Sequence, residues 1–237
     1  MNQPLKLLFK FPCRQRTELL FKSLDSLDSN IRDRNNYHIS LTLDIDDIVL
    51  NTEEVIDRIM KYPNVSIEWG YSKSKVEAIN RSMPDYDYDV LICWSNDMFM
   101  TMFGADDIMR DYILHIANSR EDFDFLIHFP ERDSMEHLNV LYVATKAYYQ
   151  RFNYIYHPSY LSLWCDNETY MVSKLLNRYH YIGVLDLYEH RNMAYTRYGI
   201  ERDELFNQQQ ALWSVDEENY QKRKAMNFEL HLITDKP

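Results

Sequence analysis

Polar and charged side chains follow four apolar segments of strand length, and their types suit the binding of a phosphorylated ligand. The segments contribute Arg14 and Arg16 from FPCRQR, Asp44, Asp46 and Asp47 from LDIDD, Lys75 and Asn80 from SKSKVEAIN, and Asp97 from SNDM. Guanidinium and ammonium groups bind phosphate oxygens, and carboxylates hold divalent cations. One acid after a strand is explained by a turn, because Ser, Asn and Asp end strands through local hydrogen bonds. Four such endings in succession are harder to attribute to turns and favour a functional site.

Apolar runs and amphipathic segments alternate through the first hundred residues. Strands are expected at 5–11, 37–43, 65–69 and 90–94, and helices at 18–27, 53–62 and 73–83. This alternation predicts an α/β fold with a mostly parallel open sheet flanked by helices. Because the carboxyl ends of parallel strands meet at one edge of a sheet, the polar residues that follow them are expected to lie together.

The pattern is less regular beyond residue 100. A helix is expected at 106–118, short strands at 125–129 and 139–145, helices near Ala147 and at 168–178, and a strand at 181–187. The region from Asp203 has a polar, helical pattern. No repeat and no linker rich in Gly or Pro interrupts the chain, so residues 1–237 are predicted to form a single domain.

Composition limits the setting and the partners. No apolar run approaches the ~18 residues of a membrane span, and the N-terminal segment lacks a signal pattern, which predicts a cytoplasmic protein. The three cysteines, Cys13, Cys93 and Cys165, are far apart, as is typical of a reducing compartment. The net charge of −11 and the scattered basic residues disfavour polymeric nucleic acid as a partner without excluding it.

Several enzyme and metal-protein classes are disfavoured. The chain has only 4 glycines, whereas nucleotidyltransferases, Rossmann dehydrogenases and P-loop enzymes use glycine-rich phosphate loops. A zinc site is disfavoured because His157, Cys165, His180 and His190 lack the spacing of zinc ligands.

Seven motifs in order resemble those of the GT-A glycosyltransferases of the family 2 type, particularly the compact stand-alone kind common in bacteriophages. They are FPCRQR, LTLDIDD, SKSKVEAIN, DVLICWSNDM, YIYHPSYLSLWCDNE, YEHRN and RDELF, and the resemblance extends from about residue 6 to residue 224. It implies a nucleotide-binding half (1–104), an acceptor half (105–202) and a C-terminal helical extension (203–237). It also implies a nucleotide-diphosphate sugar as donor, and the host cell cytoplasm as the location if the protein is viral.

The resemblance implies a metal site at the end of the fourth expected strand. SNDM matches the DxD-type motif, in which Asp97 would hold Mn²⁺ or Mg²⁺, with Ser95 and Asn96 beside the donor. His190 of YEHRN matches the second ligand, although an exposed structural histidine is the alternative. Asn96 stands where many relatives have a second acid, which motivates another interpretation: a non-catalytic carbohydrate-binding relic of the fold.

Donor contacts follow from the same resemblance. Asp44 would accept from the N3–H of a uracil-like base, with Asp46 or Asp47 near the ribose, which favours a UDP-sugar. The remaining residues expected around the donor are Pro12, Arg14, Arg16, Lys75 and Asn80. The alternatives are a solvated acidic loop for the three aspartates and a surface position for Arg16.

The segment SLWCDNE matches the acceptor side of the family. Asp166 would be the general base of an inverting transfer, with Glu168 as second choice, while a helix N-cap is the alternative role for Asp166. Aromatic rings such as Tyr156, Tyr160 or Trp164 would wall the acceptor site. The acceptor is left open among a glycan, a protein and a modified base in phage DNA, and the net charge counts against the last.

Overall fold

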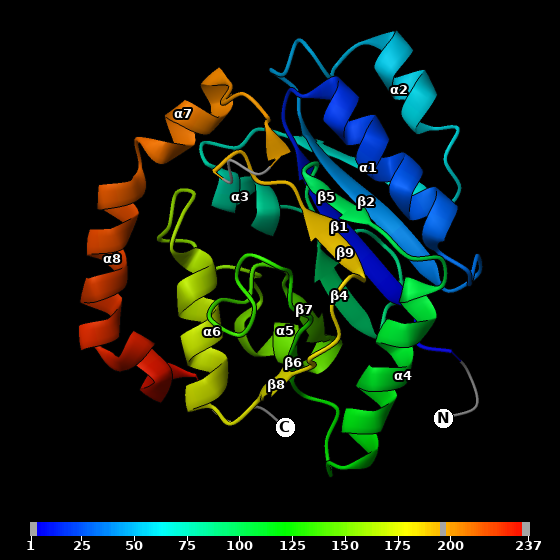
Figure 1. The fold of residues 1–237 in the computed structure, drawn as a ribbon. Coiled ribbons are helices and arrows are strands. Elements are labelled where there is room, and N and C mark those ends of the chain that lie inside the picture. The colour runs from blue at the N-terminus through cyan, green and yellow to red at the C-terminus, as the bar shows by residue number, and fades with distance from the viewer. Residues whose placement is uncertain (1–3, 195–197, 234–237) are drawn as a thin grey trace.

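The computed structural model describes residues 4–194 and 198–233 and is built around a seven-stranded sheet (Figure 1). The strands are β1 (Leu7–Cys13), β2 (Tyr37–Asp44), β3 (Val65–Gly70), β4 (Val90–Cys93), β6 (Leu126–His128), β7 (Val143–Thr145) and β8 (Tyr179–Tyr181). Their order is β3-β2-β1-β4-β7-β6-β8. The first four run parallel, β7 is antiparallel to both of its neighbours, and β8 runs parallel to β6. The predicted mostly parallel sheet is confirmed.

Helices cover both faces of this sheet and form the C-terminal region. They are α1 (Thr17–Asn30), α2 (Glu53–Ile59), α3 (Lys75–Asn80), α4 (Ala105–Asn118), α5 (Lys146–Phe152), α6 (Cys165–Leu175), α7 (Glu204–Gln210), α8 (Trp213–Ala225) and the 3-10 helix η2 (Asn227–Leu232). The predicted helical extension is therefore confirmed up to residue 233. Residues 234–237 of that prediction lie outside the described residues.

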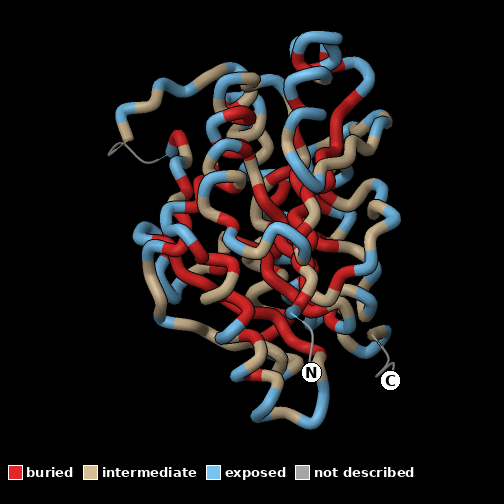
Figure 2. Tube along the Cα trace, turned by 90° about the vertical axis from the view of Figure 1, so that its right-hand side faces the viewer, coloured by how far each residue is buried: buried red, intermediate tan, exposed pale blue. Residues whose placement is uncertain are grey.

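Alternation along the central strands divides the core into two clusters. Leu7 and Phe9 of β1 belong to one cluster, whereas Leu8 belongs to the other. Successive side chains of a strand point to opposite faces, so one cluster packs against α1 and α4 and the other against α5, α6 and α8. Figure 2 shows the buried segments in red through the interior of the molecule.

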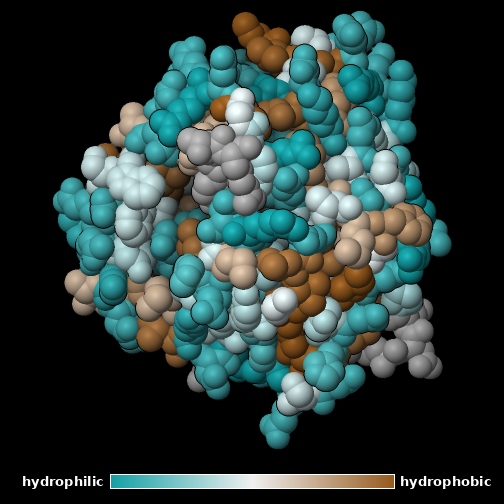
Figure 3. Space-filling view, viewed as in Figure 1, coloured by the Kyte–Doolittle hydropathy of each residue, from teal (hydrophilic) through white to brown (hydrophobic). Residues whose placement is uncertain are grey.

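Several expected elements have other bounds in the structure; the strand expected at 139–145, for example, is confined to β7. The strand expected at 181–187 is absent from the described residues: β8 ends at Tyr181, and the chain next pairs only at β9 (Tyr188–His190). Gly183 lies in this segment, and Asp186 has a left-handed φ of 68°, which breaks the extended run. Its apolar residues still pack against the first cluster, and Figure 3 shows an apolar area between β9 and α4. The helix expected at 73–83 is confined to α3.

A short second sheet places the predicted metal ligands. β9 pairs antiparallel with β5 (Met98–Met100), and Met98 stands opposite His190. Polar side chains of α1 bind the outer edge of β5: Ser23 donates to the Met98 carbonyl at 2.6 Å, and Ser26 accepts from the Met100 amide at 3.1 Å. Every backbone group that is withdrawn from water needs such a partner. Residue 97, immediately before β5, is thereby fixed beside residue 190.

Removing the Ser23 hydroxyl is expected to destabilise the protein by about 1–3 kcal/mol, because it leaves buried groups unsatisfied. The hydroxyl accepts from Nε1 of Trp94 at 2.9 Å as well as donating to β5. Urea unfolding of Ser23→Ala measures the loss. Ser29→Ala, at an exposed position of the same helix, is the matched control and should change stability by less than about 0.5 kcal/mol. Equal effects of the two substitutions would contradict this role of Ser23.

Candidate active site

The carboxyl edge of the parallel strands holds a buried acid between two guanidinium groups. Asp44, at the end of β2, is only 4% exposed. Its Oδ2 accepts from Nη1 of Arg14 at 2.9 Å, and its Oδ1 accepts from Nη1 of Arg81 at 2.7 Å. A carboxylate offers about four lone-pair positions, so Asp44 retains capacity to accept from a ligand.

Arg81 belongs to this site and was missed by the sequence analysis. It follows α3 and also donates to the Ser72 hydroxyl at 2.5 Å and to the Leu43 carbonyl at 2.8 Å. Gly70 at the end of β3 makes room for it, since a Cβ there would lie 2.9 Å from Nε of Arg81. A glycine that ends a strand, in a chain with only 4 glycines, was the available signal.

The two other acids of the LDIDD segment have different surroundings. Asp46 is exposed and meets Arg14 in a forked pair, with contacts of 3.1 and 3.2 Å, and this hydrogen bonding lowers the pKa of Asp46. Asp47 is buried and accepts from the backbone amides of Gln15 at 2.6 Å and Val49 at 3.0 Å. Asp46 therefore remains accessible to a ligand, whereas Asp47 holds the loop together.

Asp97 immediately precedes β5, and His190 is the last residue of β9. Their side chains form a buried pair. Oδ2 of Asp97 lies 3.4 Å from Nε2 of His190, and Oδ1 accepts from the Ser95 hydroxyl. Burial by itself raises the pKa of Asp97, but the charge and hydrogen bond of His190 and the hydrogen bond from Ser95 outweigh it and lower that pKa. Burial lowers the pKa of His190, and Asp97 outweighs it, so that this pKa is raised. The two groups stabilise each other as an ion pair.

The Asp97–His190 pair fits the binding of one divalent cation. Two ligands at about 2.1 Å from an octahedral cation lie roughly 3 Å apart when adjacent, close to the 3.4 Å observed. Within residues 4–194 and 198–233, no cluster of three His, Cys, Asp or Glu residues could hold a metal. A cation bound here would therefore need oxygens from a ligand and from water in addition to these two side chains.

Glu131 adds negative charge behind the pair and was not identified from the sequence. It is 2% exposed, and its carboxylate accepts from the backbone amides of Asp133 at 3.0 Å and Ser134 at 2.6 Å. Its charge contributes to the raised pKa of His190. Glu131 therefore supports a cationic state at residue 190.

The charge of Lys75 acts on the pKa values of Asp97, His190 and Asp166. The side chain is exposed at the start of α3, and among the described residues it forms no ion pair. An exposed ammonium group without an ion-pair partner among the described residues is available for an anionic ligand.

Asp166 is the second residue of α6, and its carboxylate bonds within the first turn of that helix. Its Oδ1 accepts from the backbone amide of Asn167 at 2.9 Å, and burial is the main cause of its raised pKa. A carboxylate with a raised pKa is a better proton acceptor. The N-cap of α6 is Trp164, with φ 61° and no side-chain cap bond, so the alternative of a helix cap does not describe Asp166.

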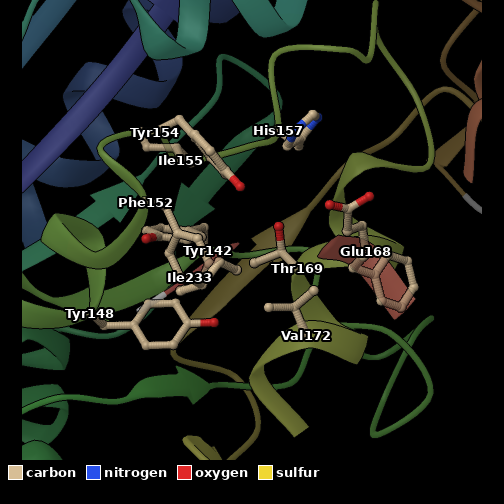
Figure 4. Close-up of a pocket in the computed structure, with 11 residues that line it drawn as sticks. Tyr142, Tyr148, Phe152, Tyr154, Ile155, His157, Glu168, Thr169, Val172 and Ile233 are labelled. Atoms are coloured by element: carbon tan, nitrogen blue, oxygen red, sulfur yellow. The ribbon is translucent and has the colours of Figure 1, made fainter. Parts of the chain in front are cut away.

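Glu168 is occupied by structural contacts. Its carboxylate receives two bonds from Arg223 of α8, at 2.7 and 2.8 Å, and one from the Tyr160 hydroxyl at 2.7 Å. Figure 4 shows Glu168 among the residues that line a pocket, with Tyr154 across from it. A buried acid in a bidentate pair with arginine ties α6 to α8, so the carboxylate of Glu168 is not free to take a proton from an acceptor.

A second acid of α8 holds the loop that precedes Asp166. Asp216 is fully buried and accepts from three consecutive backbone amides, those of Leu161 at 2.9 Å, Ser162 at 2.8 Å and Leu163 at 2.7 Å. The next residue, Trp164, has the left-handed backbone noted above. Helix α8 therefore fixes the path of the chain into the first turn of α6.

The other residues that the sequence predicts around the nucleotide-sugar donor differ in their contacts and burial. Arg16 pairs through two nitrogens with Asp203, the N-cap of α7, at 2.6 and 2.7 Å. Asn80 donates to the Tyr156 carbonyl at 2.6 Å and accepts from the Ile155 amide at 2.9 Å, so its amide anchors a loop. The structure places Pro12 inside β1, opposite Thr42, and buries Asn96 beside Asp97.

Of the aromatic rings expected to wall the acceptor site, two are inside the core. Tyr156 and Tyr160 are 7% and 0% exposed. Trp164 is half-buried and packs against Trp213 and Tyr220 of α8, with ring centroids 5.4 and 5.2 Å apart. Trp164 alone of these three retains surface for a ligand.

Comparison with solved structures places the chain in a GT-A-like glycosyltransferase fold. It is similar to S. aureus TarS (TM-score 0.62, 10% identity, 82% of this chain and 38% of that one). It is also similar to TarS 1–349 in complex with UDP-GlcNAc (0.60, 12%, 90% and 66%). A third is the mannosyltransferase PcManGT from Pyrobaculum calidifontis in complex with GDP-Man and Mn2+ (0.58, 10%, 78% and 56%).

These likenesses, at low identity, define the fold alone. The chain spans 38% to 66% of the lengths of these structures. No family model and no curated protein matches the chain. No helix among the described residues is long and apolar enough to cross a membrane.

Truncating Arg223 is expected to destabilise the protein by about 3–5 kcal/mol, because it leaves the charge of Glu168 buried and unpaired. Lys222→Ala is the matched control: Lys222 is exposed and pairs with the exposed Glu218, and its truncation should cost less than about 1 kcal/mol. Guanidinium unfolding of both variants gives the comparison. An Arg223→Ala protein as stable as Lys222→Ala would contradict the structural role given to Glu168.

Proposed function

We propose that this protein is a metal-dependent glycosyltransferase that moves a sugar from a UDP-sugar to an acceptor hydroxyl with inversion of the anomeric centre. The observation that carries the proposal is the 3.4 Å approach of Asp97 and His190 at the carboxyl edge of a glycosyltransferase-like fold. The charge of Lys75 acts on both Asp97 and Asp166. The solved structures bound to UDP-GlcNAc or to GDP-Man and Mn2+ support a nucleotide-sugar donor.

The chain supplies separate groups for the parts of the donor. Asp44 would accept from the base, and Asp46 from the ribose, because both ligand groups are hydrogen-bond donors. Lys75 and Arg14 would meet the diphosphate oxygens. A divalent cation held by Asp97 and His190 would neutralise charge that develops on the leaving diphosphate.

Asp166 would remove the proton from the acceptor hydroxyl. The acceptor oxygen then forms a bond to the anomeric carbon while the bond from that carbon to the diphosphate oxygen breaks on the opposite face. The electron pair of the broken bond leaves with the nucleoside diphosphate. Burial that raises the pKa of Asp166 suits it to this transfer.

The stand-alone bacteriophage type is proposed from the sequence resemblance, and the cytoplasmic location from the composition. The acceptor is a glycan, a protein or a modified DNA base, and the net charge of −11 disfavours the DNA base. A non-catalytic relic remains the competing interpretation, motivated by Asn96. Turnover measurements separate it from the enzyme.

UDP is expected to stabilise the protein only together with Mn²⁺, because diphosphate beside Asp44, Asp46 and Asp97 otherwise meets uncompensated negative charge. A site at about 100 times its dissociation constant adds roughly 2.7 kcal/mol. Thermal unfolding with UDP and Mn²⁺, and again with EDTA, measures this. An equal rise in the unfolding temperature in EDTA would contradict the metal dependence. A rise with GDP and none with UDP would mean that the site binds guanine and not uracil.

Asp97→Asn and Asp166→Asn are expected to fail in different steps. Asp97→Asn removes the charge that holds the cation and should weaken Mn²⁺-dependent UDP binding. Asp166→Asn should leave UDP binding intact and lower transfer by roughly 10²- to 10⁴-fold. Calorimetry with UDP and Mn²⁺ and the release of UDP during turnover measure the two effects.

Asp107→Asn, on α4 and outside the site, is the control for both variants and should match the wild type. In the wild type, transfer should increase with pH through the raised pKa of Asp166, because only the carboxylate accepts a proton. Retained turnover in Asp166→Asn would refute its role as base. Unchanged Mn²⁺-dependent affinity in Asp97→Asn would refute the cation site.

A further inference from the structure

A second pocket lies on a part of α6 that the proposed reaction does not use. Its lining residues are Glu136, His137, Tyr170, Lys174, Tyr179 and Tyr181. They come from the loop after β6, from the C-terminal half of α6 and from β8. None of them lines the pocket of Figure 4, which contacts α6 through Glu168, Thr169 and Val172.

The walls of this pocket are aromatic rings held in fixed orientations. The rings of Tyr170 and Tyr179 lie 5.2 Å apart at 83°, and the ammonium group of Lys174 lies 4.1 and 5.1 Å from their centroids. The hydroxyl of Tyr170 donates to the Glu136 carbonyl at 2.9 Å. Rings restrained in this way lose little entropy when a ligand binds.

The imidazole of His128 packs against the rings of Tyr170, Tyr179 and Tyr181. It is fully buried, its Nδ1 lies 2.6 Å from the Tyr179 hydroxyl, and burial lowers its pKa to about 4. The ring of Tyr181 packs edge-on against it at 5.2 Å. Tyr181 is half-buried, so part of its ring remains open to a ligand.

The pocket follows Asp166 along the same helix. Tyr170 and Lys174 are four and eight residues further along α6, which corresponds to about 6 and 12 Å of helix rise. Residues four apart share a helix face. A molecule that reacts beside Asp166 and extends along this face therefore reaches the tyrosines with a part distant from its reacting hydroxyl.

We propose that this pocket is an acceptor subsite that binds a sugar ring of a glycan, at least one sugar unit away from the hydroxyl that receives the donor sugar. The weakly positive C–H groups of a sugar face complement the negative face of an aromatic ring. Lys174, His137 and Glu136 offer donors and acceptors for its hydroxyls. The inference rests on the proposed function for the role of Asp166, and it selects a glycan of two or more units as the acceptor.

An array of natural oligosaccharides of one to six units, probed with the full protein in UDP and Mn²⁺, tests the subsite. Wild type should retain glycans of two or more units and no monosaccharide. Tyr181→Ala should lower that retention about tenfold or more, as expected for the loss of a stacking ring. Tyr181→Phe, which keeps the ring, should bind like wild type. Tyr112→Ala on α4 is the control for a lost half-buried tyrosine.

The outcomes separate this inference from the proposed function. Wild type that retains no glycan, or Tyr181→Ala that binds like Tyr112→Ala, overturns the subsite, while a UDP shift with Mn²⁺ leaves the transferase proposal standing. Loss of the UDP shift in wild type refutes the transferase proposal, and glycan retention that depends on the Tyr181 ring still supports the subsite. Retention of nucleic acid or protein in place of glycans overturns the choice of acceptor.

Discussion

The pairing of β5 with β9 is the constraint on which the candidate site depends. It joins two segments far apart in the chain and sets an acid and an imidazole 3.4 Å from each other. Neither strand exceeds three residues, and so short a ribbon is not stable by itself. The hydroxyls of Ser23 and Ser26 and the amide of Asn30 on α1 satisfy its outer edge. Helix α1 therefore fixes the positions of Asp97 and His190.

The C-terminal extension stabilises the other half of the site. Arg223 neutralises Glu168, Asp216 accepts three amides of the loop that leads to α6, and Asp203 pairs with Arg16 at the end of β1. Each contact joins the extension to a segment next to a proposed functional group. Buried charges of this kind are stable only when paired, so the extension and the helix α6 that it contacts are expected to unfold together.

Local patterns in the sequence were sufficient to predict the parallel half of the fold. Strand-length apolar runs that alternate with amphipathic helices carry that information, and the edge where Asp44 and Asp97 lie follows from strand direction. The second half depends on tertiary contacts, which periodicity does not encode. Residues 182–187 pack against the core outside any strand, and Glu168 was expected as a second choice of base because its partner Arg223 lies two helices later. Arg81 was missed because its contact with Asp44 is tertiary, and the one signal in the sequence was Gly70, which makes room for it at the end of β3.

The central claim is that Asp97 and His190 bind one cation together with the diphosphate of a nucleotide. A crystal structure of the protein with UDP and Mn²⁺, with anomalous scattering collected at the manganese edge, tests it most directly. The account predicts an anomalous peak within bonding distance of a carboxylate oxygen of Asp97 and of Nε2 of His190, with diphosphate oxygens completing the coordination. A peak elsewhere, or UDP bound at this edge with the Asp97–His190 ion pair intact and no manganese beside it, would contradict the account.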